Sequence, residues 1–184
     1  MVPLKKLLED YRVKYPEEST INKVLDFLEN SGSLDENNFK GHFTGSAWVL
    51  NPFKDHVLMT HHRKLGMWLQ LGGHSNGEND LFKVALREAK EESGIQEIIG
   101  LSKNIFDLDI HTIPQQIDQP SHKHYDIRFL FEADPLETEI IISEESHDVD
   151  WIPLDKVLTF NSEMSIKRMV YKTISTIHNR ICTR

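Results

Sequence analysis

Apolar residues recur at helical spacing near the start of the chain and then change to a shorter period. Residues 3–12 and 19–30 place apolar side chains on one side of a helix. After these two segments the pattern becomes that of short strands. We therefore expect a helical extension over residues 1–38 and one main domain over residues 39–184.

The main domain alternates strand patterns with two longer helical patterns. The expected strands are residues 43–50, 56–60, 68–71, 95–101, 105–112 and 125–133, and the expected helices are residues 80–93 and 163–179. In the last helix the positions expected to be buried are Met164, Ile166, Met169, Val170, Ile174 and Ile177. Residues 113–124 are polar, contain proline and are expected to form a loop. This order predicts an α/β fold with a mixed sheet between helices.

Composition limits the classes of partner. The 184 residues are 39% hydrophobic, enough for one sizeable core, and the net charge of −8 argues against binding to nucleic acid or to anionic membranes. No stretch approaches 18 apolar residues and the first residues lack a signal-peptide core, so we expect a soluble, cytoplasmic protein that has no membrane partner. A single cysteine, Cys182, excludes internal disulfides and cysteine-based zinc sites. Homodimerisation stays open.

The helix expected at residues 80–93 carries an unusual charge pattern. Glu88, Glu91 and Glu92 stand at i, i+3 and i+4, so they share one face close to the negative end of the helix dipole. The apolar stripe lies beside them, Asp80 can cap the start of the helix, and Gly94 stands where helices commonly end. Alone, such a charged run is usually a solvated helix face. A divalent cation would relieve the repulsion.

The loop before this helix favours the cation. Gly72, Gly73 and Gly77 let the backbone bend tightly and turn carbonyl groups toward an ion. Mg²⁺ prefers carboxylate and carbonyl oxygens, usually together with substrate phosphates. The loop and the helix together therefore predict a magnesium site.

The segment 73–95 resembles the signature of the Nudix hydrolases, G-x5-E-x7-R-E-U-x-E-E-x-G-U, where U is an aliphatic residue. The matching positions are Gly73, Arg87, Glu88, Glu91, Glu92, Gly94 and Ile95, with Ala89 at the inner U. The chain departs from the signature at its first glutamate, where it has Asn79, with Glu78 directly before. Either Glu78 takes over that position or the carboxylate is absent. The resemblance covers about residues 40–160.

The resemblance implies an α/β/α sandwich and a hydrolase that cleaves the diphosphate linkage of a nucleoside diphosphate joined to another group. It implies that Mg²⁺, or Mn²⁺, is bound by Glu88, Glu91, Glu92 and the carbonyl of Gly73, with Glu88 as an alternative base. Arg87 would orient the carboxylates. The expected partner is a small nucleoside-diphosphate-type substrate.

Two other functions remain open. Asn79 leaves room for a Nudix-fold module that senses nucleotides without turnover. The N-terminal helices and the pattern HHR…W…GGH also resemble isopentenyl-diphosphate isomerases. That class relies on a catalytic cysteine before the glycine loop, and the corresponding stretch MWLQLGGH has none.

Histidines and basic residues are the candidate substrate contacts. Histidines 61, 62, 74, 122 and 124 cluster in sequence around the glycine loop and before the strand at 125–133, and His74 is the best candidate. Arg63, Lys64 and Arg128 are candidate phosphate partners, since an arginine fork can grip two oxygens. Each of these is also a plausible surface residue.

An acidic pair precedes the segment HDVDWIPLDKV. The resemblance implies that a glutamate here, Glu144 or Glu145, adds a metal ligand or a base, and the simpler interpretation of either is a solvated loop acid.

Overall fold

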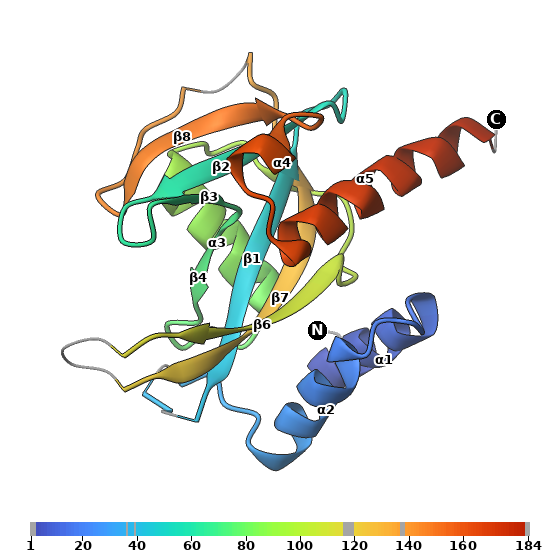
Figure 1. Ribbon diagram of the computed structural model, residues 1–184, viewed down its shortest axis with the longest axis vertical. Coiled ribbons are helices and arrows are strands. Elements are labelled where there is room, and N and C mark those ends of the chain that lie inside the picture. The colour runs from blue at the N-terminus through green and yellow to red at the C-terminus, as the bar shows by residue number, and fades with distance from the viewer. Residues whose placement is uncertain (1–2, 36, 39, 116–119, 137–138, 183–184) are drawn as a thin grey trace.

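A computed structural model describes residues 3–35, 37, 38, 40–115, 120–136 and 139–182, with side chains as far as residue 177. Its helices are α1 (Leu4–Lys14), α2 (Thr20–Asn30), α3 (Leu81–Ser93), α4 (Val157–Phe160) and α5 (Met164–Cys182). Its strands are β1 (His42–Leu50), β2 (His56–His62), β3 (Met67–Leu69), β4 (Leu71–His74), β5 (Ile99–Gly100), β6 (Asp107–Ile113), β7 (His122–Glu132) and β8 (Ser146–Pro153). The two N-terminal helices and the expected α/β fold are confirmed (Figure 1).

The strands form one mixed sheet with β1 at its centre. β1 runs parallel to β7 and antiparallel to β2 and β4. β6 and β5 pair with β7, and β8 and β3 pair with β2. Gly72 and Gly73, which the sequence predicts in a loop, are part of β4, and β1 brings them beside strands that come much later in the chain.

The two faces of β1 face different helices, because successive side chains of a strand point to opposite sides. Ala47 and Val49 belong to the apolar core that includes α3, α1 and α2. Trp48 and Leu50 belong to a second core with α5, and the Trp48 indole donates to the Thr173 hydroxyl at 3.0 Å. The sheet is thus covered on both sides, which confirms the sandwich.

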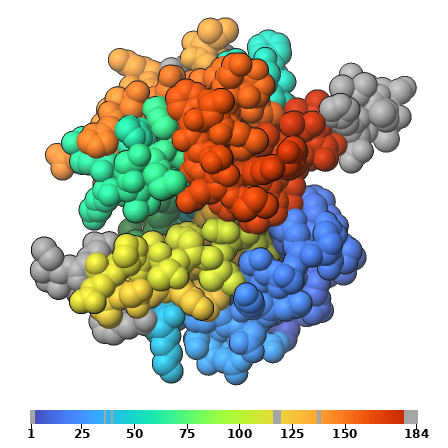
Figure 2. All heavy atoms as spheres, viewed as in Figure 1, coloured from blue at the N-terminus to red at the C-terminus, as the bar shows by residue number. Residues whose placement is uncertain are grey.

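The N-terminal helices share the first of these cores. Phe27 on α2 stacks on Tyr125 of β7, with ring centroids 3.8 Å apart, and meets Phe43 of β1 edge-on at 5.1 Å. Figure 2 shows α1 and α2 in blue against the yellow segment that contains β6, with α5 beside them. The boundary expected after residue 38 stays a prediction, and these contacts show that the helices pack on the main domain.

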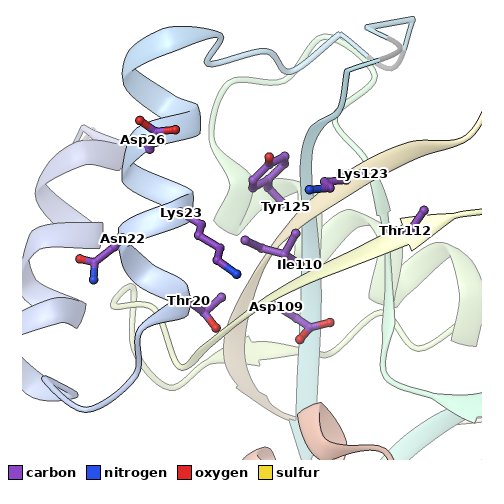
Figure 3. Close-up of a pocket in the computed structure, with 9 residues that line it drawn as sticks. All are labelled: Thr20, Asn22, Lys23, Asp26, Asp109, Ile110, Thr112, Lys123 and Tyr125. Atoms are coloured by element: carbon purple, nitrogen blue, oxygen red, sulfur yellow. The ribbon is translucent and has the colours of Figure 1, made fainter.

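A cavity remains between α2 and strands β6 and β7 (Figure 3). Its lining is mostly polar: Thr20, Asn22, Lys23, Asp26, Asp109, Ile110, Thr112, Lys123 and Tyr125. It includes none of the residues expected to bind metal or substrate.

Several expected elements differ from the structure. The strand expected at 95–101 is confined to Ile99–Gly100, and α4 was not expected. The loop expected at 113–124 is shorter, because β6 continues to Ile113 and β7 begins at His122. The pairing of β6 with β7 supplies backbone hydrogen bonds at both ends of the expected loop, so these polar residues become part of the two strands. Residues 116–119, within that loop, lie outside the described part.

The buried face of α5 was only partly predicted. Ile166, Met169 and Val170 are buried as expected, whereas Met164 and Ile174 are 73% and 37% exposed. Lys172 and Thr173 are buried instead, because Thr173 bonds Trp48 and the Lys172 ammonium lies 2.7 Å from Asp107. Polar partners on β1 and β6 therefore decide which residues of α5 are buried, and the apolar pattern of the helix alone does not. Cys182 lies beyond the described side chains.

Asp107 joins four elements through buried charge. Its carboxylate accepts hydrogen bonds from Arg168 at 2.7 and 2.8 Å, from Lys172 at 2.7 Å and from Arg128 at 3.3 Å. The Lys172 ammonium also donates to the Tyr11 hydroxyl at 2.5 Å. α1, α5, β6 and β7 are therefore linked through one fully buried carboxylate.

Among the described residues, no helix combines the length and the apolar character that crossing a membrane requires.

We expect Asp107→Asn to destabilise the fold by about 3 kcal/mol or more, because removing one partner of a buried ion cluster leaves the other charges uncompensated. Urea unfolding followed by circular dichroism measures the change. The matched control is Asp10→Asn, which breaks an exposed ion pair with Lys6 and should leave the free energy of unfolding almost unchanged, because solvent screens such pairs. Equal effects of the two substitutions would contradict the role given to Asp107.

Candidate active site

Helix α3 begins and ends where the sequence predicts. The Asp80 carboxylate accepts from the Phe82 backbone N–H at 3.2 Å, and Gly94 adopts a left-handed conformation with φ of 74°. Leu81, Val84, Ala85 and Ala89 are buried on the side that packs against the sheet. These local features fix which way the three glutamates point.

Glu92 differs from the expectation that all three carboxylates lie beside the apolar stripe. It is only 8% exposed, and its carboxylate accepts a hydrogen bond from the Gly72 N–H at 2.7 Å. Burial raises its pKa to about 8, with smaller contributions from the nearby carboxylates of Glu88, Glu145 and Glu91, while the Gly72 hydrogen bond acts in the opposite direction. Glu92 therefore holds a proton more readily than an ordinary glutamate.

Glu88 lies against the glycine loop. A Cβ atom at position 73 would come within 2.6 to 2.7 Å of the Glu88 carboxylate, so any larger residue there would displace that side chain from its present position. Burial raises the Glu88 pKa, while the Arg87 guanidinium, 2.8 Å from the carboxylate, acts in the opposite direction. Two of the three glutamates are thus enclosed where the loop meets α3.

Arg87 ties the third glutamate and the loop together. Its guanidinium donates to Glu91 at 2.7 Å and to the backbone carbonyl of His74 at 2.7 Å, in addition to its ion pair with Glu88. Glu91 is mostly solvent-accessible. Arg87 therefore sits between two carboxylates and fixes the end of β4 to α3, and its role in orienting the metal-binding carboxylates stays a prediction.

The donor set suits a hard cation. Carboxylate oxygens from Glu88 and Glu92, together with backbone oxygen from the loop, are the ligands that Mg²⁺ prefers. The raised pKa values of both glutamates show that negative charge is costly here, and a cation would relieve that cost. In this arrangement the Arg87 guanidinium is paired with both Glu88 and Glu91. Within the described part of the chain, the three glutamates are not among the sets of three ligand atoms that lie within 4.8 Å of one another.

Glu78 supports the start of α3. Its carboxylate accepts from the Asp80 N–H at 2.9 Å and lies 3.7 Å from the Lys83 ammonium, and both interactions lower its pKa. Asn79 is exposed. Glu78 thus holds the junction of loop and helix, next to the position where the signature has its first glutamate.

The acidic segment before β8 reaches the same site. Arg63 donates to the backbone oxygens of Glu144 and Ser146 at 3.0 and 2.9 Å, and its own N–H donates to the Glu145 carbonyl. The Glu145 carboxylate contributes to the raised pKa of both Glu88 and Glu92. Arg63 therefore anchors the segment that brings Glu145 to the metal candidates, and its role as a substrate partner stays a prediction.

Arg128 is buried rather than open to solvent. Its guanidinium donates to Asp126 at 2.8 Å and to Asp107 at 3.3 Å, and these carboxylates raise its pKa against the effect of burial. The sequence offered no sign of this enclosure, because the aspartates come from β6 and β7. Its binding to substrate is likewise an untested prediction.

The histidines fall into two groups. His61 stacks on Trp68 with ring centroids 5.3 Å apart. The ring centroid of His147 lies 5.4 Å from that of His61. His74 and His124 approach each other, with their Nε2 atoms 3.3 Å apart, and the buried His42 lies beside both. Sequence reasoning missed His42. The alternation of His42 with Thr44 and Ser46, which puts three polar side chains on one face of β1, is a signal that was available.

These features define a class of protein: an α/β/α sandwich that carries an acidic site where β4 meets α3. The family model described as NUDIX domain matches residues 42–172. The chain therefore belongs to the Nudix family, whose general reaction is hydrolysis of nucleoside diphosphate derivatives.

Solved structures agree on the fold. The chain is similar to an Ap4A hydrolase from C. elegans at 14% identity and a TM-score of 0.54, covering 74% of this chain and 98% of that one. It is similar to the MutT protein from Methanosarcina mazei Go1 at 16% identity and a TM-score of 0.54, covering 76% and 96%. A NUDIX family hydrolase from Clostridium perfringens matches at 22% identity and a TM-score of 0.51, covering 73% and 97%. No curated protein matches the sequence.

The raised pKa of Glu92 predicts a pH effect on stability. Because the folded-state pKa of about 8 lies above the ordinary value of 4.5, metal-free protein should lose stability as pH rises through this interval. Glu92→Gln keeps an acceptor for the Gly72 N–H and removes the charge. In EDTA, we expect the variant to be more stable than wild type at high pH by at least about 1 kcal/mol, with the difference vanishing at low pH.

Urea unfolding across this pH range measures the effect, and Glu97→Gln, at an exposed position after α3, serves as the control. Parallel stability curves for wild type and Glu92→Gln would show that Glu92 has an ordinary pKa.

Proposed function

We propose that this protein is a Mg²⁺-dependent hydrolase, with Mn²⁺ as a substitute, that cleaves the diphosphate linkage of a nucleoside diphosphate joined to another group. The observation that carries the proposal is the enclosure of Glu88 and Glu92 against Gly72 and Gly73. Two carboxylates held together with raised pKa values form a site that is unfavourable without a cation. Membership of the Nudix family supports the reaction class.

The chain's own residues supply binding and orientation. Glu88, Glu91, Glu92 and the carbonyl of Gly73 would hold the cation. Bound Mg²⁺ would supply positive charge to the phosphate oxygens as water attacks phosphorus. Arg87 orients Glu88 and Glu91 and fixes the His74 end of β4 through its carbonyl.

A proton must leave the attacking water, and a carboxylate near the site can accept it. Glu88 is the candidate base if it does not serve as a ligand. Glu145 raises the pKa of Glu88 and Glu92 through its charge, and we propose it as an assisting metal ligand or base. Arg63 is a proposed substrate contact, because it lies on a segment that meets this site. The His74 ring lies against His42 and His124 on the opposite face of β4, so only its backbone carbonyl reaches this site through Arg87, and its role as a substrate contact stays a prediction from the sequence.

Asn79 supports a second candidate, a module that binds nucleotides without turnover. The exposed Asn79 replaces the carboxylate found in the family signature, and Glu78 is engaged with the start of α3. Such a module would bind a nucleoside diphosphate compound and release no product in Mg²⁺ or Mn²⁺.

We expect wild-type protein to release a nucleoside monophosphate from at least one member of a panel of nucleoside diphosphates linked to sugars, nucleosides or phosphates, and only in the presence of Mg²⁺ or Mn²⁺. Glu92→Gln and Glu88→Gln should lower kcat/KM at least about 100-fold, because each removes a charge needed to hold the cation. Chromatography of the products measures the rate.

Glu97→Gln is the matched control, since it makes the same chemical change at an exposed position. If wild type and Glu92→Gln turn over the whole panel equally slowly, the proposed catalytic site is wrong. Tight nucleotide binding without product would then favour the sensing module.

A further inference from the structure

A group of histidines lies at one end of the polar face of the sheet, outside the set of carboxylates described above. The strand pairing brings it together: His42 on β1 is in register with His124 on β7, and the neighbouring Thr44 is in register with His74 on β4. His122, two residues before His124, faces the same side of β7. Three separate strands thus contribute to one cluster.

His42 is the most enclosed member. It is 1% exposed, and among the described residues neither ring nitrogen has a partner that meets full hydrogen-bond geometry, although the Asn38 backbone lies close enough to act on its pKa. Its ring centroid lies 5.0 Å from that of His74 and 4.6 Å from that of His124. A buried polar group without a partner is rare because leaving its water costs free energy that nothing replaces. Its ring is directed into the cluster.

Nε2 of His124 faces two ring nitrogens at once. The Nε2 atom of His124 lies 3.3 Å from Nε2 of His74 and 3.2 Å from Nε2 of His122. Nδ1 of His122 lies 2.9 Å from the Pro120 carbonyl, so it is the donor there and Nε2 of His122 carries a lone pair. A single Nε2 of His124 has either one proton or one lone pair, so it makes a good bond to only one of its two neighbours.

Two members of the cluster, His42 and His124, favour the neutral form that binds metals. Burial lowers the pKa of His124 to about 2, helped by the repulsion of His42, His74, His111 and His122. Burial and the same kind of repulsion lower the pKa of His42 to about 4, while the Asn38 backbone and Asp35 act in the opposite direction. At neutral pH these rings therefore offer lone pairs rather than positive charge.

We propose that His42, His74 and His124 form a binding site for Zn²⁺ or another late first-row transition metal. One nitrogen from each of the three rings lies within 4.8 Å of the others, the only such set of three ligand atoms in the described part of the chain. Neutral imidazole suits Zn²⁺, Ni²⁺ and Cu²⁺ rather than Mg²⁺. Zn–N distances of about 2.0 to 2.1 Å in tetrahedral geometry put ligand nitrogens roughly 3.3 Å apart. The nitrogens of His74 and His124 are already separated by 3.3 Å.

This site is distinct in chemistry from the glutamate site. Nitrogen donors select late transition metals, whereas the carboxylates of α3 select hard cations. A bound ion would also cross-link β1, β4 and β7. It would fix His74, whose carbonyl accepts the Arg87 hydrogen bond. Three protein ligands leave a fourth position open to water or to a small ligand.

Zinc binding to the full chain tests the proposal. Protein stripped with a chelator is titrated with Zn²⁺ alone in competition with a chromophoric chelator, and the bound metal is counted by mass spectrometry. We expect one tightly bound equivalent in wild type, with an affinity at least 100-fold weaker in His74→Gln and in His124→Gln. Co²⁺ in place of Zn²⁺ should give visible absorption bands that both variants lose.

Two controls separate this site from its surroundings. His111→Gln removes a histidine whose ring lies 5.3 Å from His124 but which is outside the set of three, and it should keep the tight equivalent. Glu92→Gln should keep it as well, so failure of the hydrolase proposal leaves this result unaffected. His74 is only partly buried, and circular dichroism verifies that its variant is folded.

Thermal unfolding gives an independent measurement. Saturating Zn²⁺ should raise the unfolding midpoint of wild type, because a ligand that binds only the folded state stabilises it, and the rise should vanish in His74→Gln. Wild-type affinity in both histidine variants, or no tight equivalent in wild type, would overturn the proposal.

Discussion

The close packing of α3 against β1 is the constraint on which the site depends. It occurs over Gly45, where a Cβ atom would lie 2.7 Å from the Leu81 carbonyl and 3.1 Å from the Ala85 nitrogen. Because the helix lies so near the strand, its last turns also reach β4, whose Gly73 is in register with Gly45 of β1. Glu92 can then accept the Gly72 hydrogen bond, and Glu88 can lie against Gly73. A Cβ atom at position 72 would lie 2.7 Å from the Ser46 Cα, so a larger residue there would push β4 away from β1, and a larger residue at position 73 would displace the Glu88 carboxylate.

β4 also divides two kinds of ligand chemistry. Successive residues of a strand point to opposite faces, so Gly73 meets Glu88 while the His74 ring lies in the histidine cluster. The carboxylate oxygens of Glu88 and Glu92 therefore lie on the face of β4 that packs against α3, and the histidine nitrogens lie on its opposite face. Arg87 connects them, because its guanidinium holds two glutamates and the carbonyl of His74. The proposed hydrolytic site and the proposed histidine site share this short strand without sharing a ligand.

Prediction from sequence succeeded where the determinants are local. The start and end of α3 follow from Asp80 and Gly94, whose effects act within a few residues. It failed where polar groups find partners on distant elements. Lys172 is buried in α5 because Asp107 comes from β6, and Arg128 is enclosed because aspartates of β6 and β7 surround it. The apolar pattern of the sequence predicts the burial of neither Lys172 nor Arg128. A buried charge is stable only with a charged or polar partner, and here the partners lie elsewhere in the chain.

The sequence by itself determined the family, the glutamate-bearing helix and the glycine loop before it. A helical period of 3.6 residues puts Glu88, Glu91 and Glu92 on one face whatever surrounds them. Only the tertiary structure decided that Glu88 and Glu92 are enclosed while Glu91 stays exposed, and that Glu145 reaches them. It also decided that His42, His74 and His124 meet, because the registers of β1 with β7 and with β4 are non-local pairings. Residues far apart in the chain acquire a common chemistry only when strand pairing brings them together.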